Sequence, residues 1–401
     1  MALLRESRIS TGLLAGLALL MASGPFAIDM YLPTLPALAR DLRTPESSVQ
    51  LTLTAFMVGM AVGQLVVGTI SDALGRRRLL LVGAVLSLIS CIVCAVTPAI
   101  GVLVAARLLH GIGSGACVVL ARAIVPDLAR GAEAAKAFTL MMVIQSVAPV
   151  AAPVLGGILA SPIGWRGIFW VLVAFSALQV LVVWRGIPET RHERAPLRIR
   201  PVLANFRTVL ANRRFVQMLL AFSFGFGSIF SYISASSFVI QDVMGFSVHI
   251  YTLCFAGNAL GLMLTGLLNN RLIDRFRQTT LLRAGLGVLL LANIALVAIT
   301  LLGMAPALYF PALFFCVAPI PMVMGNAFSM GTDAVREYAG AASSLMGFVQ
   351  FLVAGIATML VGIGGNMALA MALSMVLMSA IAFLASARVP EADPGIASSR
   401  A

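Results

Sequence analysis

Long, uncharged and largely apolar segments recur along almost the whole chain. Two of the longest cover 79–92 and 368–385. Segments of this kind predict helices that cross a lipid bilayer, because a helix needs roughly 20 apolar residues to span the hydrocarbon core. No segment alternates polar and apolar residues at every second position, as the strands of a membrane β-barrel do. We therefore expect an all-α, polytopic membrane protein.

The pattern separates into twelve predicted transmembrane helices joined by short polar loops. They cover 11–31, 49–70, 79–97, 100–121, 137–159, 166–184, 215–239, 250–269, 280–301, 307–327, 340–362 and 367–387. One longer segment, 185–214, holds eight arginines and three prolines. We interpret it as a cytoplasmic linker with a short amphipathic helix near 202–210 on the membrane surface. It divides the chain into an N-terminal six-helix bundle (1–184), a C-terminal six-helix bundle (215–387) and a cytoplasmic tail (388–401).

The composition agrees with this interpretation and excludes several other classes of protein. Of the 401 residues, 60% are hydrophobic and only 10% are charged, and the mean hydropathy is +1.02. An average soluble domain carries about 25% charged residues. An ordinary soluble enzyme, a disordered chain and a coiled coil are therefore excluded.

The net charge of +12 comes almost wholly from arginine, and its placement predicts the topology. Of 27 basic residues, 23 fall in segments that would share one side of the membrane, and Arg40, Arg43 and Arg166 fall on the other. Cytoplasmic loops carry such an excess of basic residues, so both termini should be cytoplasmic. We expect these loops to contact anionic lipid headgroups, at about 1 kcal/mol per residue near the surface, and to bind no nucleic acid.

Asp29 is the only one of the 15 acidic residues that falls inside a predicted span, toward its outer end. A charged carboxylate in hydrocarbon costs several kcal/mol unless it is neutralised, hydrated or paired. Because burial favours the neutral form, such a group takes up and releases protons readily. Asp29 is therefore a candidate proton carrier. The alternative is a helix-end acid that simply faces the periplasm, since Pro33 follows closely.

Arg107 is the only basic residue placed in the middle of a predicted span. An arginine does not shed its charge, so it needs acceptors in a wet cavity or among buried carbonyls. It either biases the protonation of Asp29 or clamps neighbouring backbone as a structural residue. His110 lies three residues further on and shares its helix face. It is either a titrating group or a packed hydrogen-bonding residue.

The seventh predicted span carries an aromatic stripe, with Phe222, Phe226 and Phe230 spaced four residues apart. Aromatic walls with few polar groups are typical of sites for drug-sized, amphiphilic ligands. Among the intramembrane amides, Gln145 and Asn258 are the candidates for hydrogen bonds to the substrate. Helix packing is the alternative role for the aromatic residues and for the amides.

The two halves show a faint internal similarity around the loops at 68–78 and 266–277, where a glycine precedes an acid and several arginines. Paired repeats with a substrate site between them are a transporter architecture. The first loop resembles the loop signature of the major facilitator superfamily, except that Ala73 stands where a basic residue is usual. Further segments resemble motifs of that superfamily and of its Bcr/CflA drug-resistance subfamily: 29–36, 107–111, 149–157, 165–169, 188–190 and 340–350.

The resemblance implies two conformational devices. It implies that the loop residues form a latch against the eleventh helix in the outward-facing state, whereas a plain basic loop that sets topology is the alternative. It also implies that prolines and glycines of the fifth span make a bendable gate helix, although close packing alone explains the glycines. The latch residues are Gly68, Asp72, Gly75, Arg76 and Arg77, and the gate residues are Pro149, Pro153, Gly156 and Gly157.

Together these features predict a proton-coupled multidrug efflux transporter of the bacterial inner membrane that works by alternating access. The resemblance implies substrates of the bicyclomycin or chloramphenicol type, or a broad amphiphilic range. The sequence has no nucleotide-binding loop, metal-ligand cluster or catalytic constellation, so we expect no enzyme activity, no cofactor and no metal. We also expect a monomer. A facilitator-type importer or exporter of a small metabolite on the same fold is the alternative; a membrane-embedded enzyme or a channel-like sensor is the rival from another class.

Overall fold

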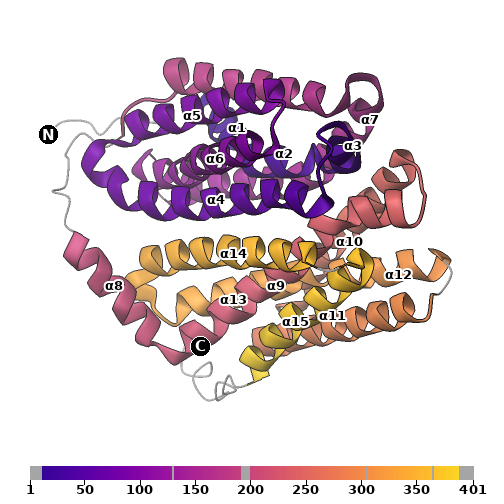
Figure 1. The fold of residues 1–401 in the computed structure, drawn as a ribbon. Helices are drawn as coiled ribbons and strands as arrows, with labels where there is room; N and C mark the ends of the chain where they lie inside the picture. The colour runs from indigo at the N-terminus through magenta and orange to yellow at the C-terminus, as the bar shows by residue number, and fades with distance from the viewer. Residues whose placement is uncertain (1–10, 129–130, 191–198, 304–305, 364, 388–401) are drawn as a thin grey trace, which may run out of the picture.

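A computed structural model of the chain describes residues 11–128, 131–190, 199–303, 306–363 and 365–387, although the side chains of a few of them, including Asp72 and Gln145, lie outside the described part. Figure 1 shows an all-helical arrangement of these residues. The helices of the first half are α1 (Thr11–Met21), α2 (Ser23–Asp29), η1 (Leu32–Thr34), α3 (Leu35–Asp41), α4 (Glu46–Leu74), α5 (Arg76–Val96), α6 (Ile100–Leu128) and α7 (Gly131–Gly186). They are followed by α8 (Ile199–Ala211), α9 (Arg213–Phe238), η2 (Val239–Val243), α10 (Val248–Leu272), α11 (Gln278–Leu301), α12 (Pro306–Val317), α13 (Ile320–Asp333), η3 (Arg336–Tyr338), α14 (Ala339–Gly362) and α15 (Met367–Ala387).

The described residues contain eleven apolar helical segments long enough to cross a membrane. One of these segments belongs to α7, where Gly164 has φ +63° and ψ −176° and separates two helices that follow each other directly. The sequence predicts two spans there, 137–159 and 166–184. The prediction of an all-α polytopic membrane protein is therefore confirmed. The division into bundles at 185–214 stays a prediction.

The helices α1–α7 lie on one side of the molecule and α9–α15 lie on the other, as Figure 1 shows. The helix α8 and the turn between α4 and α5 lie at one end, which we call the linker end. The helix α3, η2 and the start of α10 lie at the opposite end, which we call the far end. In the described part, α4 lies at the boundary of the two sides, because it packs against α6 of the first and α14 of the second.

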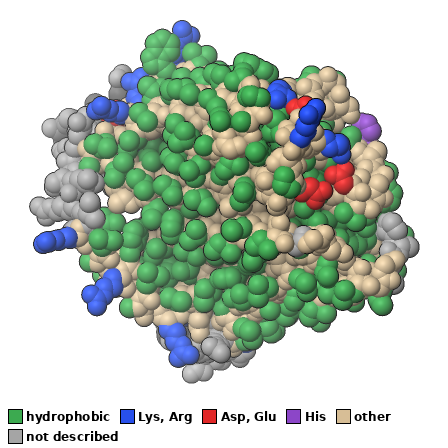
Figure 2. Space-filling model, in the orientation of Figure 1, with side chains coloured by type: hydrophobic (Ala, Val, Ile, Leu, Met, Phe, Trp, Pro, Cys, Tyr) green, Lys and Arg blue, Asp and Glu red, His purple; other side chains and the backbone are tan. Residues whose placement is uncertain are grey.

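Hydrophobic side chains cover most of the face shown in Figure 2, and the basic side chains lie near its edges. Large apolar residues of the described part are strongly exposed, including Leu253 (72%), Leu291 (70%) and Leu264 (58%). Exposed apolar surface of this extent marks a face that contacts lipid or a partner rather than water. The surface thus agrees with a protein embedded in a bilayer.

The helices α4 and α6 approach each other at backbone distance, and glycine makes this possible. A Cβ on Gly59 or Gly63 of α4 would overlap backbone atoms of α6 at Leu108 and Ile112. A Cβ on Gly111 or Gly115 of α6 would in turn overlap backbone atoms of α4. Small residues at such positions let membrane helices pack closely. The glycines of α6 therefore pack closely, with α4 as the partner.

The first span differs from its predicted bounds in a way that matters for Asp29. The sequence pattern predicts an end at residue 31, but the chain stays helical through η1 and α3 to Asp41. Pro33 and Pro36 cause the difference, because each lies at the start of its helix. Proline is tolerated there, since the missing N–H would have no partner in the helix. Asp29 consequently lies well inside the apolar segment Gly12–Asp41 rather than at its end.

Candidate functional site

Asp29 is the last residue of α2, and its side chain is only 5% exposed. Its Oδ1 atom has no hydrogen-bond partner among the described residues. The helix α2 lies against α6, to which Ser23 donates a hydrogen bond at the hydroxyl of Ser114, 3.1 Å away. A buried carboxyl group without a partner is costly as an anion and far less costly when it carries a proton. The position therefore suits a group that exchanges a proton.

Two neighbouring glycines place Asp29 where helices from both sides of the molecule meet. A Cβ on Gly156 of α7 would overlap the carbonyl oxygen of Met30, the residue after Asp29. A Cβ on Gly157 would overlap the hydroxyl of Thr252 on α10. The carboxyl group thus lies close to the junction of α2, α7 and α10.

Arg107 lies on α6 with a side chain that is 0% exposed, enclosed by aromatic rings. Its guanidinium carbon is 4.6 Å from the ring centre of Tyr31 and 4.3 Å from that of Phe56. The ring of Phe169 is 5.9 Å away. The faces of aromatic rings attract cations, at about 2 kcal/mol or more where water is absent. We call these three rings the aromatic cage.

The aromatic cage is itself held in place by hydrogen bonds. The hydroxyl of Thr52 donates to the carbonyl oxygen of Val49 at 2.6 Å. The hydroxyl of Tyr31 therefore donates its own proton to Thr52 Oγ1, 2.9 Å away. The cage combines Tyr31, directly before η1, with residues of α4 and α7 around a residue of α6. These contacts fix the guanidinium between helices that are distant in sequence.

His110 accepts a hydrogen bond from the guanidinium. Arg107 Nη1 donates to His110 Nδ1 at 3.1 Å, whereas Nε and Nη2 of Arg107 have no partner there. His110 Nε2 is 3.3 Å from the Sγ atom of Cys91 on α5. In the described part, ring faces and an imidazole nitrogen are partners of Arg107, and the predicted acceptors in a wet cavity or among buried carbonyls stay predictions.

Asp29 and Arg107 do not form an ion pair in this conformation. Both side chains are buried, and each has a polar atom without a partner. The predicted influence of Arg107 on the protonation of Asp29 is not tested by this arrangement. Both residues stay candidates for proton coupling.

The predicted aromatic stripe lies between α9 and two neighbouring helices. The ring of Phe226 lies 4.6 Å from that of Phe230 and 5.4 Å from that of Phe351 on α14. The ring of Phe222 lies 5.7 Å from that of Phe328 on α13. These ring distances are typical of favourable aromatic pairs. Helix packing thus accounts for the burial of the stripe, and its role in substrate binding stays a prediction.

Asn258 and the gate residues have different surroundings. Asn258 is buried on α10 and donates a hydrogen bond to the hydroxyl of Tyr232, 2.8 Å away. Pro149 is partly buried and Pro153 is buried, and both lie inside α7. The side chain of Gln145 lies outside the described residues.

The basic residues of the predicted latch contact other parts of the first half. Arg76 forms an ion pair with Asp127 at the end of α6, and its backbone N–H donates to Glu189 Oε1 at 2.9 Å. Arg77 Nη2 donates to the carbonyl oxygen of Trp184 at 2.6 Å. These contacts connect the start of α5 to the ends of α6 and α7. Contact with the eleventh predicted helix in another conformation stays a prediction.

Different local constraints favour glycine at the two glycine positions of the latch. Gly75 has φ +91°, a value that side chains disfavour, and an added Cβ would lie 2.7 Å from Glu189 Oε2. A Cβ on Gly68 would lie 3.2 Å from a methyl group of Val119 on α6. The side chain of Asp72 lies outside the described residues.

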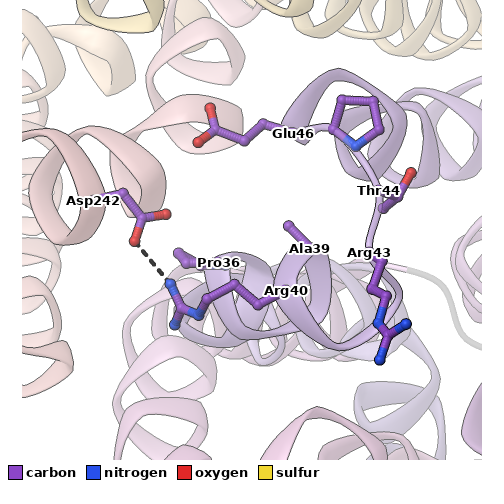
Figure 3. A pocket seen from close by; sticks show the side chains of 8 residues that line it. Pro36, Ala39, Arg40, Arg43, Thr44, Glu46 and Asp242 are labelled. Carbon is purple, nitrogen blue, oxygen red and sulfur yellow. Dashed lines mark hydrogen bonds and ion pairs between the residues drawn. The ribbon is translucent and has the colours of Figure 1, made fainter.

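At the far end, the two sides of the molecule are joined by polar contacts. Arg40 of α3 forms an ion pair with Asp242 of η2, with Nη1 3.0 Å from Oδ1. Gln241 Nε2 donates to the carbonyl oxygen of Pro33 at 3.1 Å. Figure 3 shows Arg40 turned toward Asp242, with Glu46 on the opposite rim of a cavity of about 440 Å³. We call the Arg40–Asp242 and Gln241–Pro33 contacts the far-end closure.

We predict that Asp242→Asn weakens the far-end closure only modestly. The side chains of Arg40 and Asp242 are 67% and 33% exposed, and exposed ion pairs contribute about 0.2–1 kcal/mol. The equilibrium between closed and open forms should shift by at most about fivefold. The rate at which a membrane-impermeant thiol reagent labels Ala39→Cys, a residue that lines the cavity, measures the shift. An Arg40→Asp/Asp242→Arg double variant should restore the original rate, and labelling that ignores both changes would contradict the prediction.

Several partners of the predicted site residues could not be identified from the sequence. Tyr31 lies in the segment 29–36, which resembles a family motif, and it follows Asp29 by two residues. This position is the sign in the sequence that Tyr31 belongs near the site. Phe56, Cys91 and Asp127 gave no such signal, because their roles depend on which helices become neighbours. Among the described residues, no group of three or more His, Cys, Asp and Glu side chains could hold a metal ion.

Comparisons with known proteins agree with the fold and identify the family. A family model described as Major Facilitator Superfamily matches residues 17–358. The chain is 36% identical over 384 residues to an uncharacterized MFS-type transporter, YdgK, of Bacillus subtilis, covering 95% of each chain. It is 31% identical over 345 residues to a bicyclomycin resistance protein homolog of Haemophilus influenzae, covering 85% of this chain and 86% of the relative. It is 28% identical over 326 residues to multidrug resistance protein MdtL of Salmonella typhi, covering 81% and 82%.

Solved structures show the same fold at low sequence identity. A bacterial homolog of the human lysosomal transporter Spinster, in an inward-facing and unoccupied conformation, superimposes with a TM-score of 0.73 at 19% identity, covering 96% of this chain and 98% of that one. A D-xylose–proton symporter gives a TM-score of 0.72 at 16% identity, covering 94% and 97%. The match of the family model and the relatives of at least 30% identity lead to one conclusion: the chain is an integral membrane transporter, not an enzyme, and belongs to the major facilitator superfamily.

Proposed function

We propose that this transporter exports drug-sized, amphiphilic compounds in exchange for protons, with Asp29 as the group that carries the proton. One observation supports this most directly. The Asp29 carboxyl group is buried near the junction of α2, α7 and α10, and one of its oxygens has no partner. A carboxyl group between two moving halves can meet water from either side in turn, which is what coupling requires.

In the proposed cycle, a proton from the periplasm reaches Asp29 when the transporter is open outward. Protonation releases the drug to the outside and neutralises the buried charge. The neutral site then returns to the inward-facing state, loses its proton to the cytoplasm and accepts drug again. Each turn moves a proton inward and a drug molecule outward.

The distribution of basic residues supports a membrane orientation for this cycle. The linker end carries the arginine-rich segments, and basic loops favour the cytoplasmic side. We therefore assign the linker end and both termini to the cytoplasm of a bacterial cell, and the far end to the periplasm. With this orientation the far-end closure seals the periplasmic side, which corresponds to an inward-facing conformation.

The names of two relatives support drugs as the substrate class. They are a bicyclomycin resistance protein homolog and a multidrug resistance protein. The aromatic pairs between α9, α13 and α14 are compatible with this class, because aromatic surfaces bind amphiphilic ligands without many polar contacts. We place the substrate near Phe222, Phe226, Phe230 and Asn258, with Gln145 as a further candidate. We expect the transporter to act as a monomer in contact with anionic lipids.

Transport into proteoliposomes under an imposed pH gradient tests the proposal. With an acidic interior and an uncharged drug outside, antiport drives drug inward as protons leave, whichever way each molecule is inserted. At one proton per drug and no membrane potential, a gradient of one pH unit supports about a tenfold accumulation. A symporter of a small metabolite would accumulate its substrate only under the opposite gradient. Failure of every drug in a panel to accumulate would contradict the proposal.

A further inference from the structure

The hydrogen bond between Arg107 and His110 determines where the imidazole carries its proton. A guanidinium group has only N–H donors and no acceptor. Arg107 Nη1 lies 3.1 Å from His110 Nδ1, so Nδ1 must offer its lone pair and cannot carry a proton. The remaining proton of a neutral imidazole is then on Nε2. There it points at a soft acceptor, the Sγ atom of Cys91, 3.3 Å away.

The other groups around His110 leave this assignment unchanged. The ring of Phe56 stands edge to face at 5.1 Å between ring centres. Cys91 Sγ is also 3.8 Å from the hydroxyl of Ser176 on α7. Arg107 is the charged group that acts on His110 electrostatically. No carboxylate is recorded among the described groups that face the imidazole, so nothing there stabilises a second proton on it.

We propose that His110 is a positioning residue, which as the neutral Nε2–H tautomer holds Arg107 in the aromatic cage and away from Asp29. The guanidinium is fully buried, and its Nε and Nη2 atoms have no partner in the described part. A charge-assisted hydrogen bond is roughly twice as strong as a neutral one. Without the acceptor at Nδ1, the guanidinium loses this charge-assisted hydrogen bond and is held more weakly, by its contacts with the rings of the cage. The Oδ1 atom of Asp29 also lacks a partner among the described residues, so it offers an acceptor to a released Arg107.

The consequence for transport rests on the proposed function. A positive charge beside Asp29 favours the anionic carboxylate, and a positive charge held in the cage does not. While His110 holds it in the cage, Arg107 therefore does not add to the tendency of Asp29 to lose its proton. The tautomer itself is a property of the protein that does not depend on transport.

The tautomer can be measured directly because the chain has only three histidines. A His192→Gln/His249→Gln variant leaves His110 as the single histidine. His249 is exposed near the start of α10, and His192 falls in the arginine-rich segment 185–214. With ¹⁵N-labelled histidine, the NMR spectrum should show one neutral imidazole with a protonated Nε2 and an unprotonated Nδ1. An Nδ1–H tautomer or an imidazolium at neutral pH would overturn the proposal. Arg107→Met in the same background should let the Nδ1–H tautomer appear beside the intrinsically favoured Nε2–H form, and a spectrum without any Nδ1–H signal there would also count against the proposal.

A matched pair of variants separates positioning from packing in the transport assay. His110→Asn keeps an acceptor oxygen at the place of Nδ1, whereas His110→Leu fills a similar volume without an acceptor. We expect the Asn variant to keep pH-driven drug accumulation within about threefold of the parent protein, and the Leu variant to lose more than about tenfold. A packing role predicts the reverse order, so a Leu variant that equals or exceeds the Asn variant would overturn the proposal. If the parent protein shows no accumulation, the proposed function fails, and the NMR measurement alone decides the role of His110.

Discussion

Replacement of Asp29 by asparagine should abolish pH-driven drug accumulation, from about tenfold at one pH unit to no accumulation at all. Asparagine has nearly the shape of the aspartic acid it replaces but cannot take up or release a proton. In the proposed cycle it mimics the protonated form permanently. The transporter should then bind drug poorly and move neither drug nor protons in response to the pH gradient. Drug and proton fluxes measured together in proteoliposomes check this result.

The folded structure should tolerate this change well. Asp29 is buried, and its Oδ1 atom has no partner, so asparagine removes a group that is costly to bury as an anion. The thermal unfolding midpoint in detergent should stay equal or rise. Asp333→Asn is a matched control, because Asp333 is exposed and pairs only with its neighbour Arg336 in the described part. That control should keep full accumulation. An Asp29→Asn protein that still concentrates drug against a pH gradient would remove Asp29 from the mechanism.

Gly156→Ala should reduce transport to less than about a tenth of the parent rate, although it adds a single methyl group. The added Cβ would overlap the carbonyl oxygen of Met30. A backbone oxygen cannot turn aside as a flexible side chain can, so α7 must move away from Met30 and therefore from Asp29. Overpacking of this kind costs about 1–3 kcal/mol. Transport rates in proteoliposomes and unfolding midpoints in detergent measure the two effects.

Gly257→Ala provides the matched control for this prediction. Gly257 lies within α10, and an added Cβ there meets nothing within 4 Å. Alanine is favoured over glycine inside a helix by about 0.5–1 kcal/mol, so this variant should unfold at the same temperature or slightly higher. It should transport at the parent rate. Parent-like transport by Gly156→Ala would show that the contact of α7 with Met30 is not needed for the cycle.

The fold could be predicted from the sequence because a bilayer imposes a simple rule on helix length and polarity. The apolar segments gave nearly correct bounds for most helices, such as 280–301 against Gln278–Leu301. The rule does not report local backbone geometry. It predicted an end of the first span near residue 31, whereas Pro33 and Pro36 begin new helical segments there. It also gave one span at 307–327, where the structure has α12 and α13 with a break between them.

The candidate site was only partly predictable for a related reason. Asp29 and Arg107 stand out in the sequence because charges are rare in apolar segments. Their surroundings depend on which helices become neighbours, and neighbours come from distant parts of the chain. The aromatic cage combines Tyr31, Phe56 and Phe169, and no spacing in the sequence links these three residues. The apolar pattern likewise marks Asp29 and Arg107 as site residues, but it does not show whether their side chains contact each other.

The glycine contacts between α4 and α6 have a consequence for how the protein could move. At Gly59, Gly63, Gly111 and Gly115 each backbone fits against the other with no side chain between them. Sliding one helix along the other would bring backbone atoms into overlap, so α4 and α6 should move as one rigid unit. Flexing is then left to the segments that already depart from regular helix, such as η1 beside Asp29 and the bend of α7 at Gly164. In a rocking motion of this kind, Arg107 would move together with α4 and α6, whereas Asp29 would lie beside a segment that bends.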